Sequence, residues 1–434
     1  MSNIGVLWAQ YGPYHYARLS ALKRLSASVN VHGIEMADLS RDYQWRRSIA
    51  PGEVTTLCPG YDAEQLPFTR VFHCARRSFS RLDLQVCLLP SYSPKQSLAA
   101  LLAARSLGIR TVMMNESHRG TAACRGAGVI LKRRLLKFFD AAFVGGRPHQ
   151  RYFAGLGFSE DRIVRGYDVV DNEYFSQISD QVRKRSAAVR TEYELPARYF
   201  LSLGRFVKKK NLATLLRAFR LYVDASPSKS THLVFVGAGE EGHALKSLCQ
   251  EYQLPIYHKE IVQLKALTRV GQTETIAPPR VGPAEVNPGV HFYGFRQLDQ
   301  NPIFYALADA FVLPSIREEW GLVVNEAMAS GLPVVVSETA GCAEDLLEPG
   351  PPPCAFSADL ASRFRELGVD RRICRNGFLF DPRSSQELSR VLLSLEFSED
   401  LRVAMGQASR RIIDSFSCDD FARNALRAAR LAQS

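Results

Sequence analysis

The sequence of 434 residues has little of what marks membrane, secreted or zinc-binding proteins. Its longest strictly apolar run is Leu98–Ala104, far shorter than the roughly 20 residues that a membrane-spanning helix needs. The nine cysteines are odd in number and form no Cys-x2-Cys pair, which disfavours a disulfide framework and a zinc knuckle. No basic segment precedes an apolar one at the start, so we expect no signal peptide and a reducing, cytoplasmic location.

Acidic residues are scarce in one region. Residues 119–165 hold ten Lys and Arg against three Asp and Glu, which is most of the formal net charge of +11. The periodicity there predicts a helix over 129–139 with Leu131, Leu135 and Phe138 on one face, toward a core. The basic residues expected on the other side are Lys132, Arg133 and Lys137.

Two interpretations of this basic helix remain open. It is either a solvated helix lying on a core or a surface that docks to an anionic membrane. A nucleic-acid partner is disfavoured, because the sequence has no recognised binding module and no aromatic-interleaved basic strip.

Short β-type runs alternate with helical stretches along the chain, which predicts parallel sheets covered by helices on both faces. The alternation pauses near residues 175–190 and then resumes, so we expect two α/β halves. Two segments do not fit this alternation, 254–288 and 348–375. We expect both to be surface insertions.

The densest motif spans residues 314–345 and reads strand end, loop, helix, turn and strand. Glu318 and Glu326 are separated by seven residues, the first in the loop and the second in the helix. The free N–H groups at the start of that helix form an anion site, and carboxylates accept hydrogen bonds from sugar hydroxyls. The alternative is that both carboxylates are simply solvated.

This segment resembles the C-terminal signature of family 4 retaining glycosyltransferases of the GT-B fold, within the glycosyl transferases group 1. The segment 201–211 resembles the family's loop with two basic residues, at Arg205 and Lys210, and 232–245 resembles its next strand and Gly-x-Gly turn. Glu319-Trp320 stands where Gly-Phe is more usual in the family.

The resemblance implies a role for each matching residue. Arg205 and Lys210 would hold the donor diphosphate, where fixed cations stabilise the charge of the leaving group. Glu326 would bind the ribose, and Glu318 would bind the hydroxyls of the transferred sugar. The other donor-binding residues that the resemblance implies are Gly12, Gly237, Gly321, Leu322 and Val323.

The N-terminal half matches the family less closely. Tyr14, His15 and Arg18 are expected on the acceptor side, in the segment that follows the first strand. Many family members carry a histidine after their fourth strand, where this sequence has Glu116, with His118 two residues on. The acceptor-side catalytic group therefore stays open between these two residues.

The resemblance implies two Rossmann-like domains facing a cleft, at residues 1–178 and 188–415, with a last helix in 416–434 crossing back to the first. It implies transfer of a sugar from a UDP- or GDP-linked donor to a hydroxyl acceptor, with no cofactor and no metal. The basic half favours an anionic or lipid-linked acceptor and a site at the inner face of a membrane.

Three alternatives are weighed against this reaction. A GT-B epimerase or phosphorylase would share the same pocket. A non-catalytic scaffold would lack donor binding, which the intact basic and acidic residues argue against. A dinucleotide oxidoreductase is the weakest, because no Gly-x-Gly-x-x-Gly follows the first strand.

Overall fold

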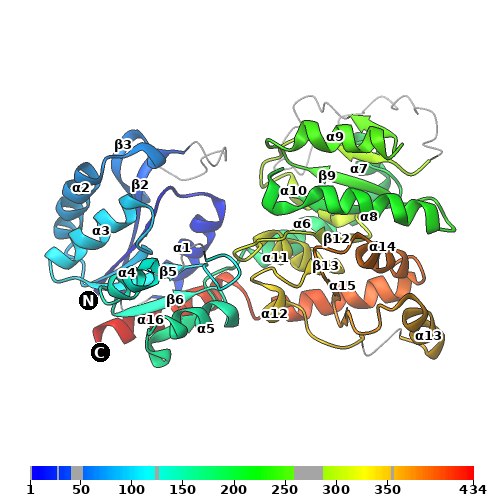
Figure 1. Cartoon of the computed structure of the whole chain (residues 1–434). Helices are drawn as coiled ribbons and strands as arrows, with labels where there is room; N and C mark the ends of the chain where they lie inside the picture. Colours follow the sequence, from blue (N-terminus) through cyan, green and yellow to red (C-terminus); the bar gives the residue numbers. More distant parts are fainter. Residues whose placement is uncertain (1, 27–28, 41–51, 123–126, 259–286, 353–355) are drawn as a thin grey trace. The chain divides into compact units, whose positions relative to one another are not determined.

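The computed structural model describes residues 2–26, 29–40, 52–122, 127–258, 287–352 and 356–434 (Figure 1). The chain divides into two compact units. Unit 1 comprises Met1–Asp171 with Ser415–Ser434, and unit 2 comprises Asn172–Asp414. Residues 172–178, expected in the first domain, therefore belong to unit 2.

Unit 1 is built on a seven-stranded parallel sheet of order β3-β2-β1-β4-β5-β6-β7. Its strands are β1 (Ser2–Trp8), β2 (Val29–Leu39), β3 (Val54–Asp62), β4 (Val86–Pro90), β5 (Arg110–Asn115), β6 (Ala141–Val144) and β7 (Ile163–Arg165). The central strands are buried on both faces, as continuous apolar runs require.

Helices cover both faces of this sheet. They are α1 (Pro13–Leu25), α2 (Phe68–Arg81), α3 (Lys95–Ser106), α4 (Ala127–Leu136), α5 (Arg147–Gly155) and α16 (Cys418–Gln433), with short 3-10 turns at Ala63–Gln65 and Glu160–Arg162. One core cluster lies under α2 and α3, and another joins α1 and α16 to the opposite face.

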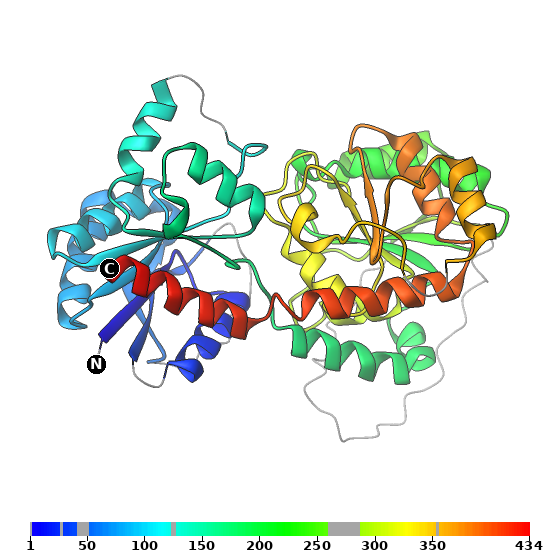
Figure 2. The same ribbon diagram turned by 90° about the horizontal axis from the view of Figure 1, so that it is seen from below.

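The last helix, α16, packs on unit 1 as expected, and Figure 2 shows it in red beside α1. Its apolar face carries Ala422, Ala425 and Ala429, whose small side chains let it lie close to the sheet. Ser417 caps the helix, because its hydroxyl accepts a hydrogen bond from the Asp420 N–H at 3.1 Å.

Unit 2 contains an eight-stranded sheet of order β10-β11-β9-β8-β12-β13-β15-β14, parallel except for the edge pair β14–β15. Its strands are β8 (Tyr199–Leu203), β9 (His232–Val236), β10 (Ile256–His258), β11 (Val290–Phe292), β12 (Ala310–Leu313), β13 (Val334–Ser337), β14 (Ile373–Cys374) and β15 (Gly377–Phe380). The chain order reverses between β8 and β12, and ligands bind at such switch points in α/β sheets.

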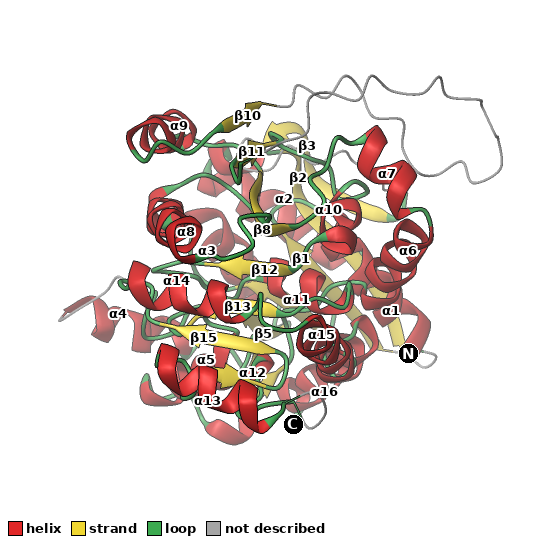
Figure 3. Ribbon diagram, turned by 90° about the vertical axis from the view of Figure 1, so that its right-hand side faces the viewer, coloured by secondary structure: helices red, strands yellow, loops and turns green. Residues whose placement is uncertain are grey.

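Its helices are α6 (Asn172–Lys184), α7 (Ser186–Glu192), α8 (Leu212–Ala225), α9 (Gly242–Glu251), α10 (Asn301–Leu307), α11 (Leu322–Ala329), α12 (Ala343–Leu346), α13 (Ala358–Leu367), α14 (Ser385–Ser394) and α15 (Glu399–Ile413), with a 3-10 turn at Lys208–Lys210. Figure 3 shows α8 and α14 on one side of β12 and β13, and α10, α11 and α15 on the other.

The two expected insertions have different outcomes. Residues 348–375 are not a surface insertion throughout, because they include α13 and β14. Leu360 and Phe364 of α13 pack into the main core of unit 2. The proline-rich start of the segment hid this helix. In the other segment β10 pairs with β11, and residues 259–286 lie outside the described residues.

Candidate functional site

The loop after β8 carries the two basic residues of the motif, Arg205 and Lys210. Arg205 is exposed, and Lys210 ends the short 3-10 turn before α8. Asn211 then adopts a left-handed conformation with φ +56°, and its side-chain amide donates to the carbonyls of Pro314 and Pro382 at 3.0 and 2.8 Å. These bonds hold the loop against the segment that follows β12.

Gly237 lies at the end of β9 with φ +144°, and a Cβ added there would stand 1.9 Å from the Gly204 carbonyl oxygen. The Gly204 N–H donates to the Val236 carbonyl at 2.9 Å. The expected reason for this glycine was close approach to a nucleotide. The structure gives another reason, which is close approach of the β8 and β9 loops.

Lys210 and Glu318 form an ion pair between the loops after β8 and β12. The Lys210 Nζ atom lies 2.5 Å from Glu318 Oε2, and the two side chains are only 14% and 9% exposed. The Ser315 hydroxyl donates to the same oxygen at 2.8 Å. The solvated-loop alternative for Glu318 is thereby excluded. Sequence reasoning missed Ser315, although it stands directly after the strand end.

Lys209 and Glu319 form a second ion pair beside the first, and their side chains are more exposed to solvent. Lys209 Nζ lies 2.6 Å from Glu319 Oε2, with side chains 31% and 34% exposed. Burial raises the pKa of Glu319, but the hydrogen bond and charge of Lys209 lower it more, so the pKa lies below its ordinary value. Two consecutive lysines therefore face two consecutive glutamates.

Gly321 begins α11 with φ +107°, a conformation that favours glycine. The first N–H groups of a helix have no intrahelical acceptor, which leaves those of Leu322 and Val323 directed away from the helix. The Trp320 indole N–H donates to Asn325 Oδ1 at 2.9 Å inside the unit, which fixes the loop before the helix. The helix start is thus set beside Glu318.

Glu326 lies in the second turn of α11 and is completely buried. The alternative in which this carboxylate faces bulk water is excluded. A small hollow opens between the ends of β8 and β12, at the switch point of the sheet. It is lined by Ser202, Leu203, Gly204, Arg205, Phe206, Lys210, Leu212, Leu313 and Pro314.

In unit 1, Gly12 ends the loop after β1 and His15 lies in the first turn of α1. The Gly12 N–H donates to His15 Nδ1 at 3.1 Å, and the imidazole stacks on Trp8 with ring centroids 4.7 Å apart. Burial, together with the charge of Arg18, lowers the pKa of His15 to about 3. The ring is therefore neutral near pH 7. Tyr14, in the first turn of α1, is partly buried.

Arg18 lies inside unit 1, where its side chain is 2% exposed. Its guanidinium donates to the Val169 carbonyl at 3.0 and 2.8 Å and stands over the rings of Tyr167 and Phe421. This position favours a structural role, joining α1 to α16, over the expected contact with an acceptor.

Glu116 follows β5 at the same edge of the sheet and interacts with the buried Asp168, which follows β7. Burial raises the pKa of Asp168 well above its ordinary value, and the Glu116 charge raises it further, although Arg18 at 3.9 Å opposes this. Burial and the charge of Glu116 thus both favour the protonated form of Asp168. Asp168 was missed because its importance depends on burial, which the short strand before it does not reveal.

His118 is 7% exposed, so it is not a surface histidine. Its Nδ1 accepts from the Gly120 N–H at 3.2 Å, and its backbone N–H donates to the Thr121 hydroxyl at 3.1 Å. Its ring meets His149 edge-on at 5.3 Å. His118 thus fixes the turn after β5, two residues beyond Glu116.

Two family models match unit 2, and both are described as glycosyl transferases group 1. They cover residues 189–265 and 254–395, which include both basic residues and both glutamates of the motif. Unit 2 therefore carries the sequence pattern of the glycosyl transferases group 1.

Among curated sequences, an uncharacterized glycosyltransferase of Methanocaldococcus jannaschii is 30% identical over 161 residues, or 37% of this chain and 31% of that protein. A D-inositol 3-phosphate glycosyltransferase of Corynebacterium kroppenstedtii is 26% identical over 266 residues, or 61% of this chain and 46% of that one. The chain therefore matches less than half the length of these relatives.

A solved structure with the same fold is HepE from Anabaena in complex with UDP and glucose. It has a TM-score of 0.64 and 16% identity, and it covers 98% of this chain and 99% of that one. Sucrose-phosphate synthase from Thermosynechococcus elongatus has a TM-score of 0.63 at 16% identity, with full coverage of both. The fold is GT-B, with two parallel-sheet units and the returning helix.

Two further observations bear on partners. Within the described ranges, no helix is long and apolar enough to cross a membrane. Over the same residues, no three His, Cys, Asp or Glu side chains gather where they could hold a metal ion. The expectation that the reaction needs no metal remains a prediction.

Proposed function

We propose that this chain transfers a sugar from a UDP- or GDP-linked donor to a hydroxyl acceptor with retention of configuration, as in family 4. The observation that carries the proposal is the buried pairing of Lys210 with Glu318, beside exposed Arg205 and the start of α11. This arrangement joins cations, helix N–H groups and a carboxylate at a sheet switch point. A diphosphate linked to a sugar has complementary groups.

In this proposal Arg205 and Lys210 bind the diphosphate, assisted by the N–H groups of Leu322 and Val323. Glu326 binds the ribose hydroxyls. A phosphate oxygen competes with Glu318 for the Lys210 ammonium, which frees the carboxylate to accept hydrogen bonds from the sugar. The ion pair of the free protein thus prepares both groups for the donor.

The proposed chemistry is a same-face displacement. The acceptor oxygen bonds to the anomeric carbon while the bond from that carbon to the diphosphate oxygen breaks, and the acceptor proton passes to the leaving diphosphate. Fixed cations and helix N–H groups stabilise the charge that develops there, so no metal or cofactor is required. Glu116, beside the buried Asp168, is the candidate to contact the acceptor hydroxyl.

Calorimetry with UDP and GDP nucleotide-sugars tests the donor site. Lys210→Ala and Glu326→Ala should each weaken donor affinity or turnover strongly. Lys208→Ala, in the same turn but exposed, is the matched control and should change little. Unchanged affinity and rate in both site variants would refute the assignment. Epimerisation, phosphorolysis or hydrolysis without dependence on an acceptor would favour the epimerase or phosphorylase.

We also propose that unit 1 associates with an anionic membrane, at its inner face, and that the acceptor is anionic or lipid-linked. The expected orientation of the basic helix was wrong, because Leu131 and Phe138 are 59% and 41% exposed and the buried residues are Leu136 and Phe139. In Figure 2 the cyan helix α4 extends away from the sheet. Exposed apolar and basic side chains on one helix support this proposal.

Sedimentation with anionic liposomes tests the membrane proposal. Reversal of Lys132, Arg133 and Lys137 to Glu should reduce binding, since each basic residue contributes about 1 kcal/mol near such a surface. The control reverses three exposed arginines of α2 and should bind normally. They are Arg76, Arg77 and Arg81. Failure of the unaltered protein to bind would overturn the proposal.

A further inference from the structure

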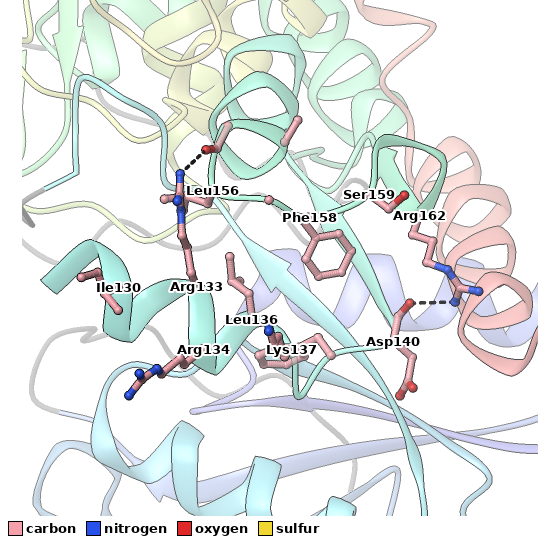
Figure 4. A pocket seen from close by; sticks show the side chains of 14 residues that line it. Ile130, Arg133, Arg134, Leu136, Lys137, Asp140, Leu156, Phe158, Ser159 and Arg162 are labelled. Carbon is pink, nitrogen blue, oxygen red and sulfur yellow. Dashed lines mark hydrogen bonds between the residues drawn. The ribbon is translucent and has the colours of Figure 1, made fainter. Parts of the chain in front are cut away.

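A pocket of unit 1 lies outside the proposed donor and acceptor sites. It has a volume of about 560 Å³ and lies between the end of α4 and the segment joining α5 to β7. Figure 4 shows Ile130, Arg133 and Arg134 of α4 on one side and Phe158 and Arg162 on the other. A space of this kind admits a small ligand or the head of a larger one.

The pocket lies at the opposite edge of the sheet from the candidate acceptor residues. Asp140 immediately precedes β6, Arg162 immediately precedes β7 and Lys137 lies four positions before β6, so these lining residues stand near the amino ends of strands. Glu116 and His118 instead follow the carboxyl end of β5. Since strands rise about 3.3 Å per residue, the two edges are more than 10 Å apart. An occupant of this pocket is therefore not the reacting acceptor.

Four basic residues line the pocket. The Arg133 guanidinium donates to the Gly155 carbonyl at 3.3 Å, and that of Arg162 donates to the Asp140 and Leu431 carbonyls at 3.1 and 3.0 Å. These acceptors are neutral, so they orient the guanidinium groups and leave their charge in place. The other two basic residues are Arg134 and Lys137, both exposed. In the part of the chain that the structure describes, none of the four forms an ion pair.

The lining has one carboxylate, Asp140, and its charge is already matched. It accepts from Arg105 at 2.9 Å, from Arg110 at 3.0 Å and from the Thr111 N–H at 2.8 Å. All three donors lie outside the pocket lining, on α3 and β5. The nearby Asp161 accepts from the Ser159 hydroxyl and does not line the pocket. The pocket therefore carries a net positive charge that attracts an anion.

The remaining wall is apolar. Leu136, Phe139 and Phe158 form a buried floor, and Ile130 is 58% exposed at the rim. A small inorganic anion cannot bury this apolar surface, whereas a ligand with an anionic head and an apolar chain can. The neighbouring Leu131, 59% exposed, extends the apolar rim.

We propose that this pocket binds the headgroup of one anionic phospholipid of the bilayer as an anchor that takes no part in the reaction. The phosphate lies among Arg133, Arg134 and Lys137, and the first part of the lipid chain lies against Ile130. The proposal rests on the proposed membrane association and adds a defined, saturable site to it.

The test is calorimetric titration of the full chain with dihexanoyl phosphatidylglycerol below its micelle concentration. We expect one site per chain. The Arg134→Gln/Lys137→Gln variant should bind roughly thirty-fold more weakly, the effect of two basic residues. Among the described residues, neither side chain has an internal partner to lose. The matched control, Arg76→Gln/Arg77→Gln on α2, should keep the affinity of the unaltered protein.

Two further measurements separate the possible ligands. Ile130→Ser should weaken binding of the short lipid but leave binding of inorganic phosphate unchanged. Equal affinity for inorganic phosphate and the lipid would overturn the lipid assignment and leave a simple anion site. Unchanged lipid binding in the Arg134→Gln/Lys137→Gln variant would overturn the pocket altogether.

The outcomes also distinguish this proposal from the proposed function. Binding to anionic vesicles without saturable binding of the short lipid would overturn the pocket and leave general membrane association standing. Donor binding, measured with UDP-linked sugars, should be the same in the pocket variant and the unaltered protein. Loss of donor binding in the pocket variant would show that the substitutions disturb the fold, and Arg134→Lys/Lys137→Arg then supplies the charge-preserving comparison.

Discussion

The buried pair of Lys210 and Glu318 allows a prediction that joins stability to donor binding. In Lys210→Met the cation is lost, while the Glu318 carboxylate stays about nine-tenths buried beside the Ser315 hydroxyl. Removing one member of a buried pair costs about 3–5 kcal/mol. Because Lys210 keeps 14% of its exposure, we expect the lower end, about 3 kcal/mol.

The second variant, Glu318→Gln, should cost less, because the lysine can turn toward solvent. The double variant should be more stable than the sum of the two losses predicts, by about 1–2 kcal/mol. Urea unfolding followed by tryptophan fluorescence measures these differences. Trp320, buried and two residues from Glu318, is a reporter inside the loop.

Binding of UDP then separates the two residues. Lys210→Met should weaken it strongly, because a cation for the diphosphate is gone. Glu318→Gln should instead tighten it, because the diphosphate no longer competes with a carboxylate for Lys210, while sugar transfer slows. The reasoning is refuted if Glu318→Gln weakens UDP binding as much as Lys210→Met does, or if Lys210→Met leaves the free energy of unfolding unchanged.

Three further predictions concern backbone and titrating groups, all measured by urea unfolding. Gly237→Ala should lower the free energy of unfolding by more than about 2 kcal/mol, because its Cβ would lie 1.9 Å from the Gly204 oxygen. The control Gly294→Ala, at φ +66° in open space, should lower it by only about 1 kcal/mol. Equal losses in the two variants would contradict the clash. The raised pKa of Asp168 means that stability falls as pH rises above its ordinary value of 3.8, and Asp168→Asn should remove that part of the decline. The pKa of His15 is lowered to about 3, so its contribution to the free energy of unfolding is present above pH 6.5 and is lost as the pH falls toward 3. His15→Gln should therefore reduce the loss of stability over this acidic range. An unaltered dependence of stability on pH would contradict the prediction.

The donor motif could be predicted from sequence because its signals are local. Glu318, Gly321 and Glu326 lie within one strand–loop–helix passage, and the apolar strands on either side fix that passage at a carboxyl edge. What the sequence does not contain is the pairing of Lys210 with Glu318, which are 108 residues apart. That contact depends on β8 and β12 being neighbours, which periodicity cannot establish.

The basic helix shows a different limit. The spacing of Leu131, Leu135 and Phe138 is that of a core-facing stripe, but α4 ends at Leu136, and the residues that pack on the core of unit 1 are Val129, Leu136 and Phe139. The buried face of a helix that ends early need not coincide with the stripe that the spacing predicts. The amphipathic pattern was therefore real, while the surface that it faces was assigned wrongly.

The positive charge of the chain falls into two electrostatic classes. In the donor region Lys209 and Lys210 each face a glutamate, so these groups are neutral as pairs before any ligand arrives. A donor must exchange with a carboxylate there, and this favours a ligand that also offers hydroxyls to the carboxylate that it displaces. In the pocket beside α4, the basic residues face backbone carbonyls or solvent. The charge of Asp140 is neutralised by Arg105 and Arg110, which lie outside the pocket lining. Their field extends into water over about a Debye length. The first arrangement selects among ligands by exchange at short range, whereas the second attracts any anion and relies on its apolar wall to distinguish a lipid from phosphate.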